Sequence, residues 1–251
     1  MQRVRYRGAE GISWGDLDGG RIARLDGMLG MPDGGAEMLS DVTLLPPCEP
    51  QTIVCVGKNY ARHIRELGGD EDLPNEPGLF LKAPNSLSAP GDPIPYPVWT
   101  NELHYEGELA LVIGREMRRV SAEHALDYVL GYTCACDVTA RDRQRSDLQW
   151  ARAKSADGFC PIGPWLETDF DPAAVGLQTR VNGTLRQDGN TSDLLFSVPT
   201  VLAYISNFMT LRPGDVVLTG TPEGVGELSV GDEVEVTVEG IGSLVNVVER
   251  L

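Results

Sequence analysis

A short apolar run at residues 105–113 carries two glutamates one residue apart, Glu106 and Glu108. The run is rich in Leu, Val and Ile and is followed by Gly114, a pattern that predicts a β-strand. Side chains alternate between the two faces of a strand, so both carboxylates should point the same way. Two buried neighbouring carboxylates repel each other unless a positive charge lies between them. The pattern therefore indicates a divalent-cation site, with a water-exposed strand that binds no metal as the alternative.

Asp137 adds a third carboxylate, because it follows residues 132–136, which read as another apolar strand. Three carboxylates would form an all-oxygen site, which selects hard cations such as Mg²⁺, Mn²⁺ or Ca²⁺ over zinc. Such a site leaves about three positions of an octahedral ion open for water or substrate, which suits a catalytic metal. Spacing alone leaves this interpretation and the exposed strand equally open.

The chain has 251 residues, enough for one large domain or for one domain with a small module. Its net charge of −16 argues against binding to nucleic acid or to an anionic membrane, since both need basic patches. No apolar stretch approaches the ~20 residues that span a bilayer, and the N-terminus lacks the apolar core of a signal peptide. We therefore expect a cytoplasmic protein. Five cysteines, an odd number, favour reduced thiols over a disulfide framework.

Turns rich in Gly and Asp predict a small N-terminal β-rich module at 1–48, joined by a proline-rich linker to a larger domain at 49–251. Strand patterns dominate the larger domain, so we expect an α+β protein built around a β-sandwich or roll. Apolar periodicity and capping residues predict helices at 61–67, 121–130 and 197–209. The polar stretch 70–77, bounded by proline, is a candidate lid hinge.

Seven motifs occur in order within residues 53–248, and together they closely resemble those of the short bacterial members of the fumarylacetoacetate hydrolase (FAH) family. They lie at 56–66 (VGKNYARHIRE), 80–84 (FLKAP), 105–114 (YEGELALVIG), 131–144 (GYTCACDVTARDRQ), 153–164 (AKSADGFCPIGP), 181–193 (VNGTLRQDGNTSD) and 213–226 (PGDVVLTGTPEGVG). The resemblance implies the mixed β-sandwich roll of this family and a homodimer. Gly107 is one departure, because the family usually carries a larger residue there. It should lie on the face away from the carboxylates, and we expect little effect from it.

The resemblance implies that Glu106, Glu108 and Asp137 bind Mg²⁺ or Mn²⁺. It also implies a small-molecule partner, a 2-oxo acid or its enol. Such an acid offers a carboxylate oxygen and a ketone oxygen as a bidentate chelate for the ion. The metal then stabilises the enolate that forms when a bond to C3 breaks or a proton leaves it.

Three residues are implied to be catalytic. Lys154 resembles the active-site lysine of the family, which would hold developing negative charge or relay a proton. His63 and Glu66 are three residues apart and share a helix face. The resemblance makes His63 a general base that Glu66 orients. A surface lysine and an exposed helix pair without a role are the alternatives.

Four residues are candidates for substrate binding: Lys82, Arg141, Gln144 and Thr221. Lys82 resembles a second lysine on the substrate side. Arg141 and Gln144 could bind the substrate carboxylate. An equally good interpretation pairs Arg141 with Asp142 or another carboxylate. Thr221 lies in a glycine-rich turn whose N–H groups could hold the carboxylate end.

The expected activity is hydrolysis of a C–C bond, or isomerisation, of a 2-oxo or enol dicarboxylic acid through a metal-stabilised enolate. Such reactions belong to the breakdown of aromatic-derived acids. An oxaloacetate decarboxylase or acylpyruvase of central metabolism is the alternative. A non-catalytic metal-binding protein that keeps the fold is an alternative of another class. Loops near 70–78, 85–100 and 142–152 would set the substrate specificity.

Overall fold

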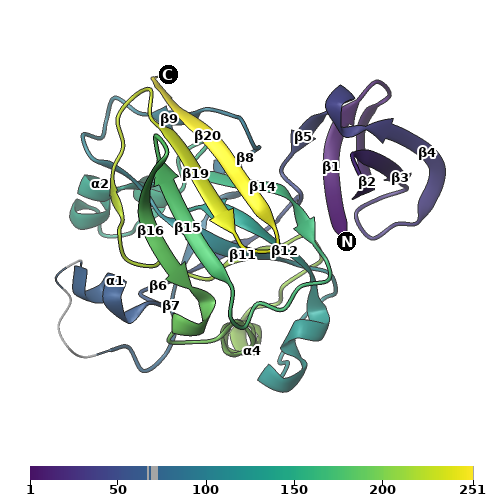
Figure 1. Cartoon of the computed structure of the whole chain (residues 1–251). Coiled ribbons are helices and arrows are strands. Elements are labelled where there is room, and N and C mark those ends of the chain that lie inside the picture. Colours follow the sequence, from purple (N-terminus) through teal and green to yellow (C-terminus); the bar gives the residue numbers. More distant parts are fainter. Residues whose placement is uncertain (67, 69–72, 251) are drawn as a thin grey trace.

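Strands make up most of the regular structure in the computed structural model, which describes residues 1–66, 68 and 73–250 (Figure 1). The helices are few and short, so the expected α+β class is confirmed. None of the described helices is long and apolar enough to cross a membrane. All five cysteines are free and buried.

The largest sheet has twelve strands, in the order β4-β3-β2-β1-β14-β12-β11-β17-β6-β7, with β5 beside β1 and β8 beside β14. They are β1 (Gln2–Gly8), β2 (Gly11–Asp18), β3 (Arg21–Leu25), β4 (Pro32–Met38), β5 (Thr43–Leu45), β6 (Ile53–Gly57), β7 (Gly78–Lys82), β8 (Leu87–Ser88), β11 (Gly107–Ile113), β12 (Val129–Cys136), β14 (Cys160–Glu167) and β17 (Val216–Leu218). The N-terminal strands extend this sheet at one side, because β1 pairs with β14 (Figure 1). A domain boundary at residue 48 stays a prediction.

Two smaller sheets complete the strands. The five-stranded sheet has the order β16 (Thr184–Asn190), β15 (Gly176–Val181), β19 (Glu233–Val238), β20 (Gly242–Arg250) and β9 (Ile94–Tyr96). The three-stranded sheet has the order β13 (Thr139–Ala140), β10 (Leu103–Tyr105) and β18 (Gly226–Glu227).

Strand β11 is buried on both faces. Leu109 and Leu111 belong to the apolar core that the large sheet shares with the five-stranded sheet, whereas Ala110 and Val112 belong to a second core on the opposite face. A strand covered on both faces explains why the sequence is continuously apolar there. Glu108 has the same parity as Ala110, so its side chain points away from the five-stranded sheet.

The α-helices are α1 (Ala61–Glu66), α2 (Arg141–Ser146), α3 (Ala151–Lys154) and α4 (Val198–Phe208), and the 3-10 helices are η1 (Leu39–Asp41), η2 (Pro84–Ser86), η3 (Ala122–Tyr128) and η4 (Thr191–Asp193). The helix predicted at 121–130 is present as a 3-10 helix at Ala122–Tyr128, but its predicted end is wrong, because Val129 and Leu130 join strand β12. The loop expected at 142–152 contains α2 and the start of α3. Residues 70–72 of the expected lid hinge lie outside the described residues.

Candidate active site

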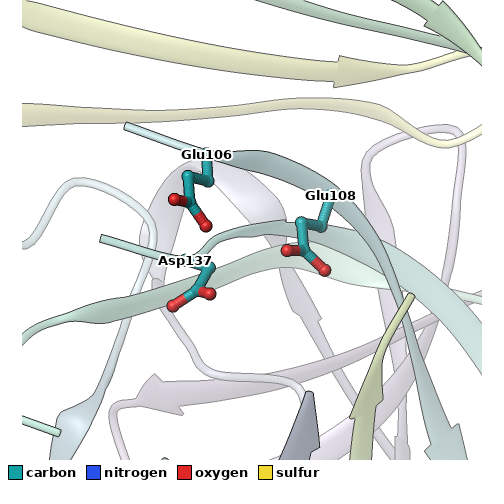
Figure 2. Close-up of side chains that lie close together, drawn as sticks. All are labelled: Glu106, Glu108 and Asp137. Atoms are coloured by element: carbon teal, nitrogen blue, oxygen red, sulfur yellow. The ribbon is translucent and has the colours of Figure 1, made fainter. Parts of the chain in front are cut away.

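Three carboxylates meet where β11 and β12 lie side by side (Figure 2). The strands are antiparallel with Gly107 opposite Cys136, which makes Glu106 and Asp137 neighbours. The Asp137 N–H donates to the Glu106 carbonyl at 2.8 Å. Glu108 is two residues further along, so its side chain returns to the same face. One carboxylate oxygen from each residue lies within 4.8 Å of the other two, and all three residues are buried.

Glu106 lies in a break between β10 and β11, where the sequence predicts one uninterrupted strand. Side chains fix this break. The Gly107 N–H donates to Gln187 Oε1 at 2.9 Å, and the Gly107 carbonyl accepts from the Thr221 hydroxyl at 2.8 Å. The Gln187 amide also donates to the Thr221 hydroxyl at 2.7 Å. Gln187 was not predicted from the sequence to belong to the site, because its burial in β16 is evident only in the structure.

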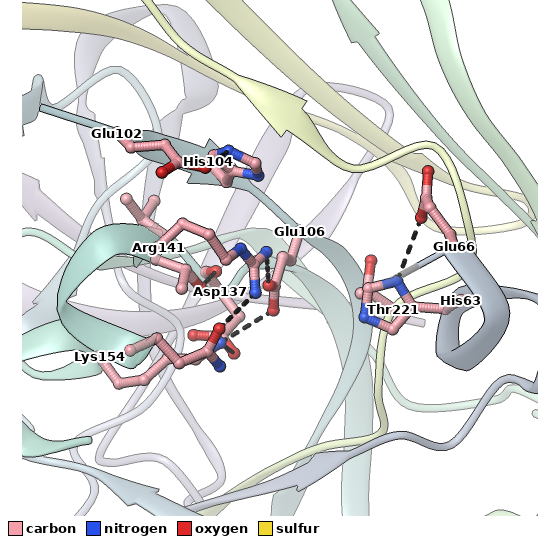
Figure 3. Close-up of polar contacts among 12 residues, drawn as sticks. His63, Glu66, Glu102, His104, Glu106, Asp137, Arg141, Lys154 and Thr221 are labelled. Carbon is pink, nitrogen blue, oxygen red and sulfur yellow. Dashed lines mark hydrogen bonds and ion pairs between the residues drawn. The ribbon is translucent and has the colours of Figure 1, made fainter. Parts of the chain in front are cut away.

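Three basic side chains contact the carboxylate cluster. Lys154 Nζ lies 2.9 Å from Glu106 and 2.5 Å from Asp137. Lys82 Nζ lies 2.5 Å from the other oxygen of Asp137. Arg141 forms an ion pair with Glu106 (Figure 3). Of the two interpretations of Arg141, the pairing with a carboxylate is therefore observed, and its partner is a candidate metal ligand.

Glu108 differs from its two neighbours. No basic side chain of the described residues lies within 4.0 Å of it, and its carboxylate accepts one hydrogen bond, from the Gly220 N–H at 2.6 Å. Burial, and then the charges of Asp137 and Glu106, raise the pKa of Glu108 well above its ordinary value. Burial also acts to raise the pKa of Glu106, but its two basic partners outweigh burial and lower that pKa. A hard divalent cation beside Glu108 would relieve the repulsion, so the donor set fits Mg²⁺ or Mn²⁺.

Helix α1 supplies a histidine–glutamate pair (Figure 3). His63 is buried, and its Nδ1 lies 3.4 Å from Glu66 Oε2. Glu66 in turn accepts hydrogen bonds from the Gly224 N–H at 3.0 and 3.1 Å. Gly224 has a φ of 97° and no room for a Cβ beside the Arg186 carbonyl, so the turn requires glycine there. Burial lowers the pKa of His63, which keeps its imidazole neutral at pH 7.

These groups surround one cavity of about 310 Å³. The predicted site residues on its wall are His63, Glu106, Glu108, Asp137, Arg141, Gln144, Lys154 and Thr221. Two other predicted site residues do not line the cavity but contact residues that do: Lys82 contacts Asp137, and Glu66 contacts His63. Phe80 and Trp150 form an apolar part of the wall, with their ring centroids 5.5 Å apart. The cavity thus combines oxygen ligands for a cation, basic groups for an anion and a neutral imidazole.

Two bonds limit what the substrate-side residues are free to do. Arg141 donates to Gln144 Oε1 at 2.6 Å, so these side chains form one unit at the cavity. Thr221 uses its hydroxyl on the Gly107 carbonyl and on Gln187. Lys58 and Arg145 also line the cavity, and neither was predicted from the sequence to belong to the site.

Residues 52–249 match the family described as fumarylacetoacetate (FAA) hydrolase C-terminal, and residues 1–47 match the one described as Rv2993c-like, N-terminal. A 5-carboxymethyl-2-hydroxymuconate delta-isomerase from Mycobacterium smegmatis has a similar crystal structure, with a TM-score of 0.93, 44% identity and 100% coverage of both chains. The oxaloacetate tautomerase FAHD1 of Bos taurus is 43% identical over 80% of this chain and 92% of its own. A maleylpyruvate hydrolase from Sphingobium sp. SYK-6, in complex with manganese (II) and pyruvate, has a TM-score of 0.83 and 32% identity, covering 100% of this chain and 99% of its own.

Proposed function

The chain belongs to the fumarylacetoacetate hydrolase family, as an enzyme of that family, and from this we propose that it acts on 2-oxo or enol dicarboxylic acids with a divalent metal. The observation that carries the proposal is the buried cluster of Glu106, Glu108 and Asp137 in a cavity that His63 also lines. The manganese and pyruvate in the structure of the maleylpyruvate hydrolase support a metal and a 2-oxo acid here. The choice of Mg²⁺ or Mn²⁺, and a homodimer, stay predictions.

Glu106, Glu108 and Asp137 would hold the ion. When bound, it supplies a Lewis acid for the negative charge that develops on a substrate oxygen. The three carboxylates are formally balanced by the basic side chains that contact them, so this end of the cavity would carry a net positive charge in the loaded enzyme. A positive, buried surface suits the doubly negative enolate of a 2-oxo acid.

The chain's own groups would move the proton. His63 is neutral and lines the cavity, so it can take a proton from C3 of the substrate or from a water molecule. Glu66, 3.4 Å from Nδ1, would hold the ring and stabilise its protonated form. Lys154 lines the cavity and its Nζ contacts both Glu106 and Asp137, so it would hold negative charge on the enolate oxygen.

Hydrolysis, isomerisation and tautomerisation are the reactions named for the three relatives. All three can pass through an enolate at C3, so one set of residues serves each of them. Cleavage of a C–C bond by His63-activated water is the first candidate, and isomerisation needs the same proton movement without water. Decarboxylation of oxaloacetate would use the same enolate.

A turnover assay with Mg²⁺ and with Mn²⁺ tests the proposal on acetylpyruvate, oxaloacetate and a hydroxymuconate-type dienol. We expect metal-dependent turnover of at least one of them, and its loss in Glu106→Ala. Activity on the dienol alone would identify an isomerase. Absence of turnover with all three would contradict the proposed substrate class.

A further inference from the structure

Lys58 occupies a defined place at the edge of the active-site cavity. It follows strand β6, which is parallel to β17, so the turns that follow these two strands lie at the same edge of the sheet. The turn after β17 contains Thr221. Both Lys58 and Thr221 line the cavity, but Lys58 is exposed whereas the carboxylate cluster is buried.

The backbone of Lys58 is held in an unfavourable conformation. Its φ is 59°, in the left-handed region that residues other than Gly and Asn rarely adopt. The next side chain, Asn59, is buried and fixes the turn. It donates to the Thr219 carbonyl at 2.8 Å and to the Phe196 carbonyl at 3.1 Å, and it accepts from the Phe196 N–H at 2.8 Å. Strain that the surroundings maintain at a cavity is characteristic of functional positions.

The ammonium of Lys58 also differs from the other positive charges on the cavity wall. Lys154 contacts Glu106 and Asp137, Arg141 contacts Glu106, and Arg145 contacts Glu102; these pairs are all ion pairs within 4.0 Å. Among the residues that the structure describes, Lys58 has no such carboxylate partner. Its charge is therefore available to an anionic ligand.

We propose that Lys58 binds the second carboxylate of a 2-oxo dicarboxylic acid and makes the enzyme prefer dicarboxylates to monocarboxylates of equal length. This inference rests on the proposed function, in which the carboxylate cluster and its ion take the 2-oxo end. The far end of such a substrate then lies toward the exposed side of the cavity, where Lys58 is held. The chain has only three lysines among its 21 basic residues, and a flexible stem with a point charge suits a ligand whose far end varies in position.

Equilibrium binding of two 2-oxo acid probes tests this directly. 2-Oxoglutarate and 2-oxopentanoate have the same chain length and differ in the second carboxylate. Titration calorimetry with saturating Mg²⁺ compares the wild-type protein with three variants. Lys58→Asn removes the charge but still allows a left-handed backbone, and Lys58→Arg keeps the charge. Arg65→Met removes a charge from an exposed position of α1 that does not line the cavity.

We expect wild-type protein to bind 2-oxoglutarate about 10- to 100-fold more tightly than 2-oxopentanoate, the range of a hydrogen bond to a charged group. Lys58→Asn should lose that preference while binding 2-oxopentanoate as before, and Lys58→Arg and Arg65→Met should retain it. Equal weakening of both probes in Lys58→Asn, no weakening at all, or no wild-type preference would each overturn the role of Lys58. Failure of the proposed function would instead appear as absent turnover, which the binding measurement does not depend on.

Discussion

The carboxylate cluster and the histidine–glutamate pair face the same cavity but are held in different ways. Glu108 belongs to β11 in the centre of a twelve-stranded sheet, Glu106 directly precedes β11, Asp137 directly follows β12, and all three are buried. His63 and Glu66 belong to a six-residue helix that is attached through the Glu66 bonds to the Gly224 N–H. In the proposed function, the sheet would fix where a cation and a substrate bind, and the short helix would add the group that transfers the proton. Substitutions in the carboxylate cluster should abolish metal binding, and substitutions in the histidine–glutamate pair should leave metal binding unchanged.

The largest effect should come from Glu108→Gln. The amide can still accept from the Gly220 N–H, but one anionic ligand is lost. We expect Mg²⁺ binding to be lost and turnover to fall by about 10⁴-fold or more, since a metal supplies several kcal/mol of charge stabilisation. The metal-free protein should become more stable, by about 1 kcal/mol, because repulsion within the cluster is relieved. Calorimetry measures the Mg²⁺ affinity and thermal unfolding measures the stability. The control is Glu249→Gln, at an exposed position. Retained Mg²⁺ affinity in Glu108→Gln would contradict the role of the carboxylate cluster.

A smaller effect should come from His63→Gln. We expect kcat to fall by about 10²- to 10³-fold, as for the loss of a general base, with unchanged Mg²⁺ affinity. His124→Gln is the matched control, because that histidine is exposed on η3. Loss of metal binding in His63→Gln would show that the histidine–glutamate pair and the carboxylate cluster do not act separately.

Gly107→Ala should test how tightly strand β11 packs against the five-stranded sheet beside the carboxylate cluster. A Cβ at this position would lie 2.0 Å from Thr179 Oγ1, on the side of the five-stranded sheet. We expect a loss of about 1–3 kcal/mol in the free energy of unfolding, the usual range for overpacking. The double variant Gly107→Ala/Thr179→Ala should recover most of it, and Gly78→Ala, whose Cβ would find an ordinary contact at 3.5 Å, should be neutral. Chemical denaturation measures all of them.

The smallest effect concerns pH. Burial lowers the pKa of His63 from its ordinary value of 6.5, so the neutral base persists to lower pH than a free histidine would. Protonation disables the base, so kcat should fall on the acid side, with a midpoint below 6.5. The residual kcat of His63→Gln should not show this fall at low pH. A wild-type midpoint above 6.5 would remove His63 from the proposed role.

The sequence predicted the parts of this site that strand periodicity determines. Glu106 and Glu108 converge because alternate residues share a face, and Asp137 joins them because its strand pairs with theirs. Contacts between distant segments were not predictable from local patterns. Gln187 accepts a hydrogen bond from Gly107, which is 80 residues away in the sequence, and the sequence around neither residue indicates this contact. The space opposite Gly107 is likewise occupied by Thr179, which no motif links to it.

The helix predicted at 121–130 shows the same limit in the secondary structure. Its residues have helical spacing and a Ser121 cap, but Val129 pairs with Ile113 of the central strand. Sheet pairing therefore ends the helix early. Lys58 is a third case, since its conformation depends on Asn59 reaching Thr219 from a distant strand.

Exchange of the C3 protons of pyruvate in D₂O, followed by NMR, tests the central claim most directly. Enolate formation exchanges these protons with solvent, whichever reaction the natural substrate undergoes. We predict exchange that requires Mg²⁺, is abolished in Glu108→Gln, and is reduced about 10²-fold or more in His63→Gln although the metal still binds. Exchange at the uncatalysed rate with saturating Mg²⁺ and wild-type protein would contradict the account.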